Sequence, residues 1–427
     1  MSGWIELKLY TLDYIGCYIA TVLIVFFIYF LFLKKFYISF YDPFFFTILG
    51  SAFAATVPFF MYRVDLLGNM EYIYWFAGTE LAFILGLVIV GYQKQTIEKQ
   101  NELKYEEDGK RIFYSYFIIY MCLRFLGYIK VGIPLIDYDS HVEAFQDGGV
   151  LVGLLPETIS VPLVFMLVFN LYKKKSLLMI LYGVLIGLTF ILTGAKSSFL
   201  SFAYGVFFLI LLINKCGLKR SNKIIKIGNI ILFIAVFSVF FILYIRAGDN
   251  ASLDEILISF GNRLEGYGDI YAYAFQPGVM EHLMKNYDFY ELYIAPILGM
   301  LHIVPRDESA EAIGRLAVMS DTNIYMIEAP NGRMNIVNLM SFGIFGGVAV
   351  SFLLGGLILY ITRIFYMKNK FSLYSYILWI FVYNTVVIIP TDPRLFIGLF
   401  MYGMFANLLI LFFSYLLRME SKRNAEI

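Results

Sequence analysis

Long apolar segments alternate with short polar ones along the whole chain. Residues 14–33 and 43–62 each come close to the ~20 apolar residues that an α-helix needs to cross the hydrocarbon of a bilayer. The pattern recurs in further segments at 72–92, 112–130, 156–172, 176–193, 198–214, 228–245, 336–361, 371–389 and 396–416. No segment shows the period of two that is typical of barrel strands. The pattern predicts an all-α polytopic membrane protein of about eleven spans, with residues 1–427 forming one membrane domain.

The polar connections between these segments fall into two sets that differ in basic residues. One set holds 21 Lys and Arg, in the connections 34–35, 94–111, 173–175, 215–226, 363–370 and 418–423. The opposite set holds 11, and Arg124 lies within a span. Because connections rich in Lys and Arg stay in the cytoplasm, we expect the first set to be cytoplasmic. The N-terminus is then outside and the C-terminus inside.

Two of the outer connections are long enough to carry structure of their own. The smaller covers residues 131–155 and the larger residues 246–335. Within the larger one, residues 294–305 are apolar but too short to span a bilayer, so we expect a re-entrant or interfacial segment there. The cytoplasmic connections are short, and we therefore expect any chemistry to face outward.

Composition excludes several other classes of protein. The chain is 60% hydrophobic and 15% charged, whereas soluble domains are nearer 45–50% apolar and about 25% charged. A net charge of +1 argues against nucleic acid as a partner. The three cysteines, Cys17, Cys122 and Cys216, have no paired spacing, and the three histidines make no zinc motif. We find no P-loop and no soluble domain with a DxD-like metal–nucleotide motif, and we expect no metal and no cofactor.

The larger outer loop combines an acidic balance with a preference for arginine. It has thirteen acids against six bases, and five of those bases are Arg246, Arg263, Arg306, Arg315 and Arg333. A guanidinium binds phosphate with two parallel hydrogen bonds and stays charged, which suits a diphosphate ligand. The alternative is that these arginines pair with the many acids and stabilise the loop.

Arg333 lies in the stretch "APNGRMN" (329–335), directly before an apolar segment. We expect it at the membrane surface, where a lipid-borne diphosphate would lie. Pro330 and Gly332 favour a tight turn before the helix, and the first amides of that helix could help to hold an anion. Two other outer positions have the same potential: Lys196 in "TGAKSSFLSF" (193–202) and Arg394 in "TDPRLF".

Charged residues inside spans are expensive and need partners or a wet interior. Glu80 and Arg124 are the clearest examples, and we expect them to form an ion pair that locks two helices.

The many spans, the two outer loops, the "TGAKSSFLSF" turn and the stretch "APNGRMNIVNLMSFGIFGG" (329–347) together resemble bacterial O-antigen polymerases of the Wzy type. That resemblance implies a GT-C-like inner-membrane glycosyltransferase with its outer loops in the periplasm. Such an enzyme joins oligosaccharide repeat units carried on undecaprenyl diphosphate, with a co-polymerase setting chain length. Its partners would be these lipid-linked oligosaccharides and membrane lipid.

This chemistry needs positive charge at the leaving diphosphate and a general base for the attacking hydroxyl. The diphosphate candidates are Arg246, Arg263, Arg306, Arg315, Arg333, Arg394 and Lys196. The candidates for the base are Asp307, Glu308, His302 and Asp321. A flippase for the same lipid-linked sugar and an O-antigen ligase are the alternatives; a flippase would place more charge inside its spans and need no ninety-residue loop.

Overall fold

The computed structural model describes residues 3–37, 39–91, 106–138, 141–150, 152–174, 176–194, 196–216, 266–301, 303, 312–324, 330–367 and 372–426, and single helical positions at 229, 233 and 237. Throughout these ranges the regular structure is helical and contains no strand. The all-α class predicted from the apolar pattern is therefore confirmed. The predicted span 228–245 lies outside the described residues except at those three positions.

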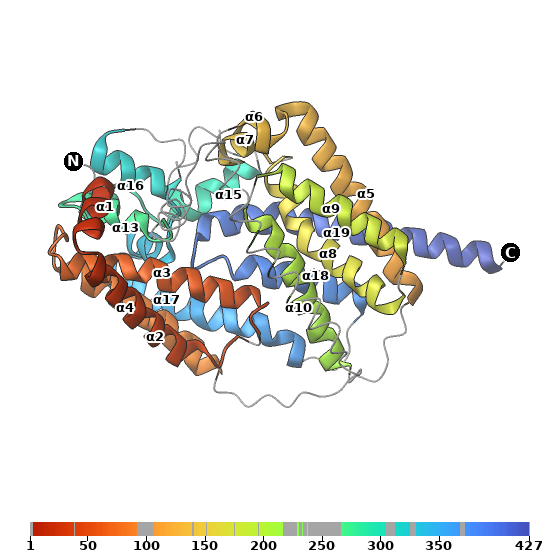
Figure 1. Cartoon of the computed structure of the whole chain (residues 1–427), viewed down its shortest axis with the longest axis horizontal. Coiled ribbons are helices and arrows are strands. Elements are labelled where there is room, and N and C mark those ends of the chain that lie inside the picture. Colours follow the sequence, from red (N-terminus) through yellow and green to blue (C-terminus); the bar gives the residue numbers. More distant parts are fainter. Residues whose placement is uncertain are drawn as a thin grey trace.

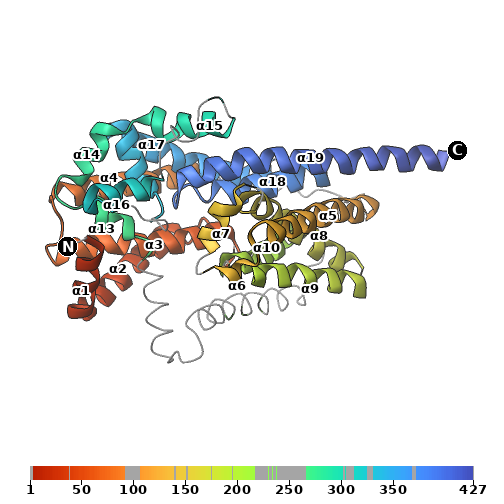
Figure 2. The same ribbon diagram turned by 90° about the horizontal axis from the view of Figure 1, so that it is seen from above.

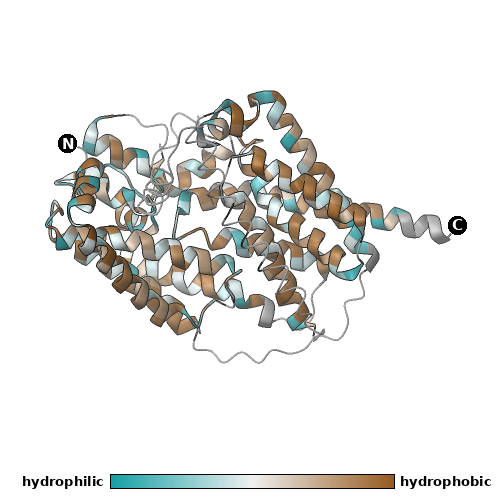
Figure 3. Ribbon diagram, in the orientation of Figure 1, coloured by the Kyte–Doolittle hydropathy of each residue, from teal (hydrophilic) through white to brown (hydrophobic). Residues whose placement is uncertain are grey.

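Ten of the predicted spans coincide with apolar helices. Seven of these helices are long and apolar enough to cross a membrane: α2 (Ile15–Leu33), α3 (Pro43–Arg63), α4 (Glu71–Gly91), α5 (Glu106–Val131), α8 (Leu154–Lys173), α17 (Met334–Met367) and α19 (Pro393–Glu426). The three shorter apolar helices are α9 (Leu177–Leu192), α10 (Leu200–Lys215) and α18 (Leu373–Val386). Figure 3 shows the apolar character of these long helices. They support a membrane-embedded protein.

The long helices form two groups that lie side by side (Figures 1 and 2). One group contains α2, α3, α4 and α17, and the other contains α5, α8, α9 and α10. Helices α18 and α19 pack on α8, and α18 also contacts α17, where the Trp379 indole donates to the Ile361 carbonyl at 3.0 Å. These two helices therefore join the groups.

Short helices cover one end of the first group. They are α1 (Gly3–Asp13), α13 (Asp269–Ala274), α14 (Val279–Asn286) and α16 (Ile313–Thr322). The π-helical turn η2 (Tyr290–Ile294) leads into α15 (Ala295–Met300), which packs beside α19 and includes much of the apolar stretch 294–305. The loop 131–155 contains α6 (Pro134–Asp137) and α7 (His141–Gly148).

Helix α17 is not the single span that the apolar segment 336–361 predicts. Gly343 has φ 65° and ψ −172°, a backbone conformation that is essentially restricted to glycine. The Asn338 amide donates to the Ser351 hydroxyl at 2.9 Å, although 13 residues of continuous helix would separate them by about 20 Å. The chain therefore reverses at Gly343. We call residues 334–342 the half-helix and residues 344–367 the long arm.

The long arm packs against α4 at very close range. A Cβ at Gly86 would lie 2.1 Å from the Phe352 carbonyl oxygen, and one at Gly355 would lie 2.2 Å from the Phe83 carbonyl oxygen. Only glycine permits such an approach of two backbones, which is how small residues serve helix pairs in membranes. This tight pairing leaves the half-helix enclosed by α3, α4 and α13.

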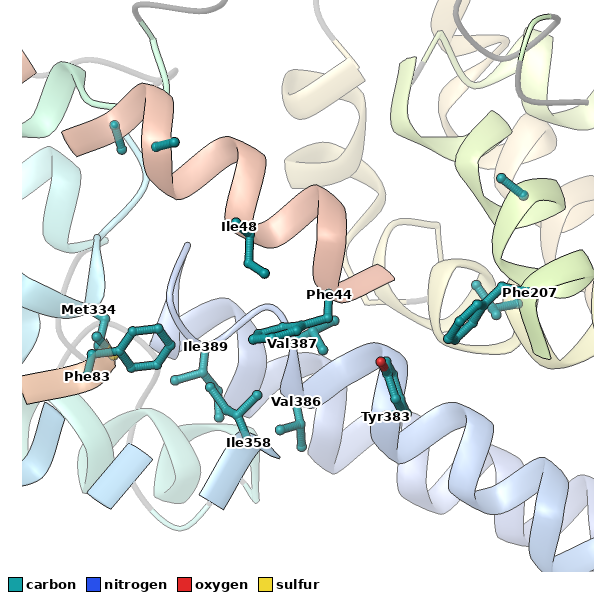
Figure 4. Close-up of a cluster of buried hydrophobic side chains, with 14 of the residues drawn as sticks. Phe44, Ile48, Phe83, Phe207, Met334, Ile358, Tyr383, Val386, Val387 and Ile389 are labelled. Atoms are coloured by element: carbon teal, nitrogen blue, oxygen red, sulfur yellow. The ribbon is translucent and has the colours of Figure 1, made fainter. Parts of the chain in front are cut away.

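Apolar side chains close the bundle beside the start of the half-helix. Figure 4 shows Met334 against Phe83, and Ile389 and Val387 with Phe44 beneath Ile48. All of these side chains are buried. Polar groups at the start of the half-helix are therefore bordered by these buried apolar side chains.

Candidate functional site

Arg333 directly precedes the half-helix and is 2% exposed. Its Nη2 donates to the Ser51 hydroxyl of α3 at 3.0 Å. Its Nε and Nη1 are shut off from solvent and have no hydrogen-bond partner among the described residues. Since a buried charged group without partners is costly, these two nitrogens mark a place where a ligand would be stabilising.

The turn before Arg333 is held from two sides. The Asp392 carboxylate accepts from the Gly332 amide at 3.4 Å, and the Pro390 carbonyl accepts from the Met334 amide at 3.4 Å. Behind it, α16 approaches so closely that a Cβ at Gly314 would lie 1.8 Å from the Pro330 carbonyl oxygen. Two of the amides proposed to help with an anion are thus already bonded. The guanidinium is the group left to bind it.

The position of Arg333 differs from the expected one at the surface. Ser51 is the ninth residue of the 21-residue α3, so Arg333 lies beside the middle of that helix. The reversal at Gly343 explains this depth, because the half-helix runs back along the long arm and starts inside the bundle.

The two asparagine side chains of the half-helix, Asn335 and Asn338, are bonded to its neighbours, whereas the buried Ser341 hydroxyl has no partner among the described residues. The Asn335 amide donates to the Thr79 hydroxyl at 3.0 Å and to Glu80 Oε2 at 2.9 Å, both on α4. Its Oδ1 accepts from the Tyr271 hydroxyl of α13 at 2.9 Å. Glu80 also accepts from the Tyr29 hydroxyl of α2. Four helices are thus tied to the half-helix around Arg333.

Asp269 reaches the same region from an earlier stretch of the long loop, residues 246–335. It begins α13, which dips into the bundle: Tyr267 lies against Gly50, and Gly268 against Ala54, both of α3. Asp269 Oδ1 is shut off from solvent and has no partner among the described residues. Burial raises the pKa of Asp269 to about 7, and the Arg333 charge opposes this rise.

No ion pair joins these two described side chains, although Arg333 is close enough for its charge to act on the carboxyl. The same region of the bundle therefore contains a cationic donor, Arg333, and a carboxylate acceptor, Asp269, and each has atoms that make no hydrogen bond among the described residues. A ligand that brings an anionic oxygen for Arg333 and a hydroxyl for Asp269 would satisfy both.

Asp392 links this region to Arg394. Its Oδ1 accepts from the backbone amides of Arg394 at 3.0 Å and Leu395 at 2.9 Å, which begins α19. Burial raises the pKa of Asp392, while these hydrogen bonds and the Arg394 charge oppose the rise. Arg394 thus follows directly on the segment that holds the Gly332 turn. This places one of the predicted diphosphate-binding arginines near Arg333 in the fold.

The remaining candidates on described helices are Asp321, Arg315 and Lys196. Asp321 accepts from the Gly3 amide at 3.0 Å, so it ties α16 to α1, and burial raises its pKa. Arg315 is also on α16. Lys196 begins the short helix η1 (Lys196–Phe199), whose Ser198 hydroxyl lies 3.4 Å from that of Thr193.

Six candidates lie outside the described residues: Arg246, Arg263, Arg306, His302, Asp307 and Glu308. Their placement relative to Arg333 stays a prediction.

The expected ion pair between Glu80 and Arg124 is wrong. Arg124 donates from Nη2 to Glu157 Oε1 of α8 at 2.9 Å and from Nε to the Tyr120 hydroxyl at 3.1 Å. Glu80 bonds instead to Asn335 and Tyr29. The buried Arg124 and the half-buried Glu80 lie in different helix groups, and each is bonded to partners in its own group.

Sequence reasoning missed Asp269, Asn335 and Ser51 as site residues. Asp269 stands between small residues and an aromatic run in "GYGDIYAYA" (266–274), a pattern typical of a buried rather than a solvated acid. That context was the available signal. Ser51 and Asn335 gave none, because a single polar residue in an apolar helix commonly bonds its own backbone.

No protein family, curated protein or solved structure matches this chain. Within the described ranges, no group of three or more His, Cys, Asp or Glu is placed to hold a metal ion. The functional argument therefore depends on the geometry around Arg333.

Proposed function

We propose that this protein is an O-antigen polymerase, a membrane glycosyltransferase that joins oligosaccharide repeat units carried on undecaprenyl diphosphate. The observation that carries the proposal is Arg333: a guanidinium buried in the helix bundle, oriented by Ser51 and with two nitrogens unbonded. To reach Arg333, the diphosphate of the lipid-linked substrate would have to enter the bundle from the membrane surface, and water is scarce at such a buried position.

The chemical role of Arg333 is to stabilise the leaving group. When the bond between the sugar and the lipid diphosphate breaks, negative charge grows on the diphosphate oxygen. A fixed cationic donor in a region of low dielectric stabilises this charge more than it stabilises the bound substrate. The other basic candidates, Arg246, Arg263, Arg306, Arg315, Arg394 and Lys196, would assist from the long loop and the helix ends.

The full arrangement that we propose is GT-C-like, with eleven spans in the bacterial inner membrane. The N-terminus and the long loop would lie in the periplasm, and the C-terminus in the cytoplasm, because basic residues gather in the opposite connections. A chain-length-regulating co-polymerase would be its protein partner.

Two alternative functions, flippase and ligase, would act on the same lipid-linked sugar. A flippase needs charged groups along a path through its spans, whereas the described charges within spans are held locally, Arg124 by Glu157 and Glu80 by Asn335. A ligase would use the same diphosphate chemistry with lipid A core as acceptor. The acceptor therefore separates polymerase from ligase.

The test is the lipopolysaccharide banding of a strain that lacks this gene. A polymerase defect leaves single repeat units attached to the core, because flipping and ligation continue. Complementation should restore the ladder. A core without any attached unit would contradict the proposal and point to a flippase or a ligase.

A further inference from the structure

Two described stretches of the long loop lie beside α3 inside the bundle, and each brings one unsatisfied side chain. Residues 267–269 enter beside Gly50 and Ala54 of α3, and Arg333 enters beside Ser51 of the same helix. Asp269 Oδ1 lacks a donor, and Arg333 Nε and Nη1 lack acceptors. Such complementary groups would normally bond to each other, and here the fold holds them apart.

We propose that Asp269 is the proton acceptor for the attacking sugar hydroxyl, opposite the diphosphate held by Arg333. This inference rests on the proposed polymerase function and names its base. The geometry supports it because α13 packs on α3 through Gly268, where a Cβ would lie 2.6 Å from the Ala54 carbonyl oxygen, and this fixes the residue that follows. The packing of Gly268 on α3 thus fixes the backbone position of Asp269.

The surroundings of Asp269 suit a base that works near neutral pH. Burial raises its pKa to about 7, and a general base is most effective when its pKa is close to the operating pH. The candidates named from the loop sequence differ in this respect: Asp321, the one that is described, is occupied by the Gly3 amide.

Ionisable groups lie on several elements around Asp269. Arg333 acts on it from the start of the half-helix, and Tyr271 and Tyr273 lie on α13 itself. The neighbouring helices carry Glu80 (α4), Arg315 and Asp321 (α16), Glu6, Lys8 and Asp13 (α1), and Glu281, His282 and Lys285 (α14). The facing stretch of α3, residues 50–57, has no ionisable side chain. Arg333 is the cation whose charge acts on Asp269.

The step is a displacement at the anomeric carbon. The acceptor hydroxyl oxygen forms a bond to that carbon while its proton passes to Asp269. The bond from the carbon to the diphosphate oxygen breaks, and its electron pair leaves with the lipid diphosphate beside Arg333. Asp269 then releases the proton to water or to the departing diphosphate, so that the enzyme returns to its starting state.

The test uses the full chain in nanodiscs with lipid-linked single repeat units purified from the deletion strain. Asp269→Asn should lower kcat by a factor of ~10²–10⁴, the usual contribution of a general base, with KM little changed. Asp269→Glu should recover part of the rate with a displaced pH profile, which a merely structural role would not produce. Asp288→Asn is the matched control, since Asp288 is exposed and, among the described residues, its carboxylate accepts from the Glu291 amide at 3.1 Å.

The outcomes separate the two proposals. A wild-type rate and pH profile from Asp269→Asn, beside an inactive Arg333→Ala, would overturn the role of Asp269 and leave the polymerase standing. An unchanged lipopolysaccharide ladder in the deletion strain would overturn the polymerase and the role of Asp269 with it.

Discussion

The Arg333 guanidinium and the Ser51 hydroxyl are 3.0 Å apart, although 282 residues separate them in the chain. This bond attaches the end of the long loop to the middle of α3. It also leaves two nitrogens of the guanidinium directed away from Ser51 and without partners among the described side chains. The arginine is therefore oriented before any ligand arrives.

Ser51→Ala tests this orientation. Removing the hydroxyl releases one hydrogen bond of the charged group, so we expect the polymerisation rate to fall roughly tenfold, which is about 1.4 kcal/mol of transition-state stabilisation. The measurement is the rate of polymer formation in nanodiscs. Ser115→Ala is the control, because the Ser115 hydroxyl donates to the Arg111 carbonyl of its own helix. Equal rates for the two variants would contradict a role for Ser51.

Gly343→Ala tests the reversal of α17. A Cβ at this position meets nothing within 4 Å, so the substitution adds strain without a clash. Holding a non-glycine residue in this conformation costs on the order of 1–3 kcal/mol, and we expect a lower melting temperature in detergent. Gly187→Ala in α9, which also meets nothing within 4 Å, should leave melting unchanged or raise it. A Gly343→Ala variant as stable as wild type would show that the chain does not reverse there.

Breaking the pair of Arg124 and Glu157 should destabilise the second helix group. Glu157→Gln leaves a buried guanidinium without its counter-charge. Because the Glu157 side chain is 27% exposed, we expect a loss of about 2 kcal/mol, below the ~3–5 of fully buried pairs. Arg418→Gln is the comparison variant: the buried Asp108 loses its 3.3 Å contact with Arg418 but keeps Arg111 at 3.9 Å, so we expect a smaller loss than for Glu157→Gln.

The double variant Arg124→Leu with Glu157→Leu removes both charges and should recover much of the stability lost in Glu157→Gln. Thermal melting in detergent measures all of these variants. If the double variant melts below Glu157→Gln, the explanation by an unpaired buried charge is wrong.

Asp269 makes stability depend on pH in a defined direction. Its pKa is raised from 3.8 to about 7, so the folded protein binds this proton more tightly than the unfolded chain does. The contribution of this group to stability is therefore lost as the pH rises from about 4 to about 7, by an amount on the order of a few kcal/mol.

Asp269→Asn mimics the protonated side chain and should remove this loss. We expect the variant to melt above wild type at pH 8, and the gap between the two melting temperatures to be clearly smaller at pH 5. Asp392 also has a raised pKa and is present in both proteins, so it does not affect the difference. A gap of the same size at both pH values would contradict the buried position of Asp269.

The helical fold was predictable because polar residues bound the apolar segments on both sides. The segment 72–92 agrees with α4 (Glu71–Gly91) for this reason. The reversal of α17 was not predictable, since hydropathy is continuous across Gly343 and the neighbouring Gly346 and Gly347 give the same local signal. Which of them has a positive φ depends on packing against α4.

The site could be predicted only in part. Arg333 was identified from its place beside an apolar segment, but its depth and its bond to Ser51 depend on the reversal at Gly343. The wrong pairing of Glu80 with Arg124 has a similar origin. Two charges of opposite sign inside spans need partners, and the sequence does not show that Glu157 is nearer to Arg124 and Asn335 nearer to Glu80.

The most direct test of the central claim is the lipopolysaccharide banding of a strain whose chromosomal copy has Arg333→Ala, with the amount of protein in the membrane measured beside it. We predict that the ladder collapses to core with a single repeat unit, as in the deletion strain, while the variant is present at its normal amount. A wild-type ladder from this variant would contradict a diphosphate-binding role for Arg333.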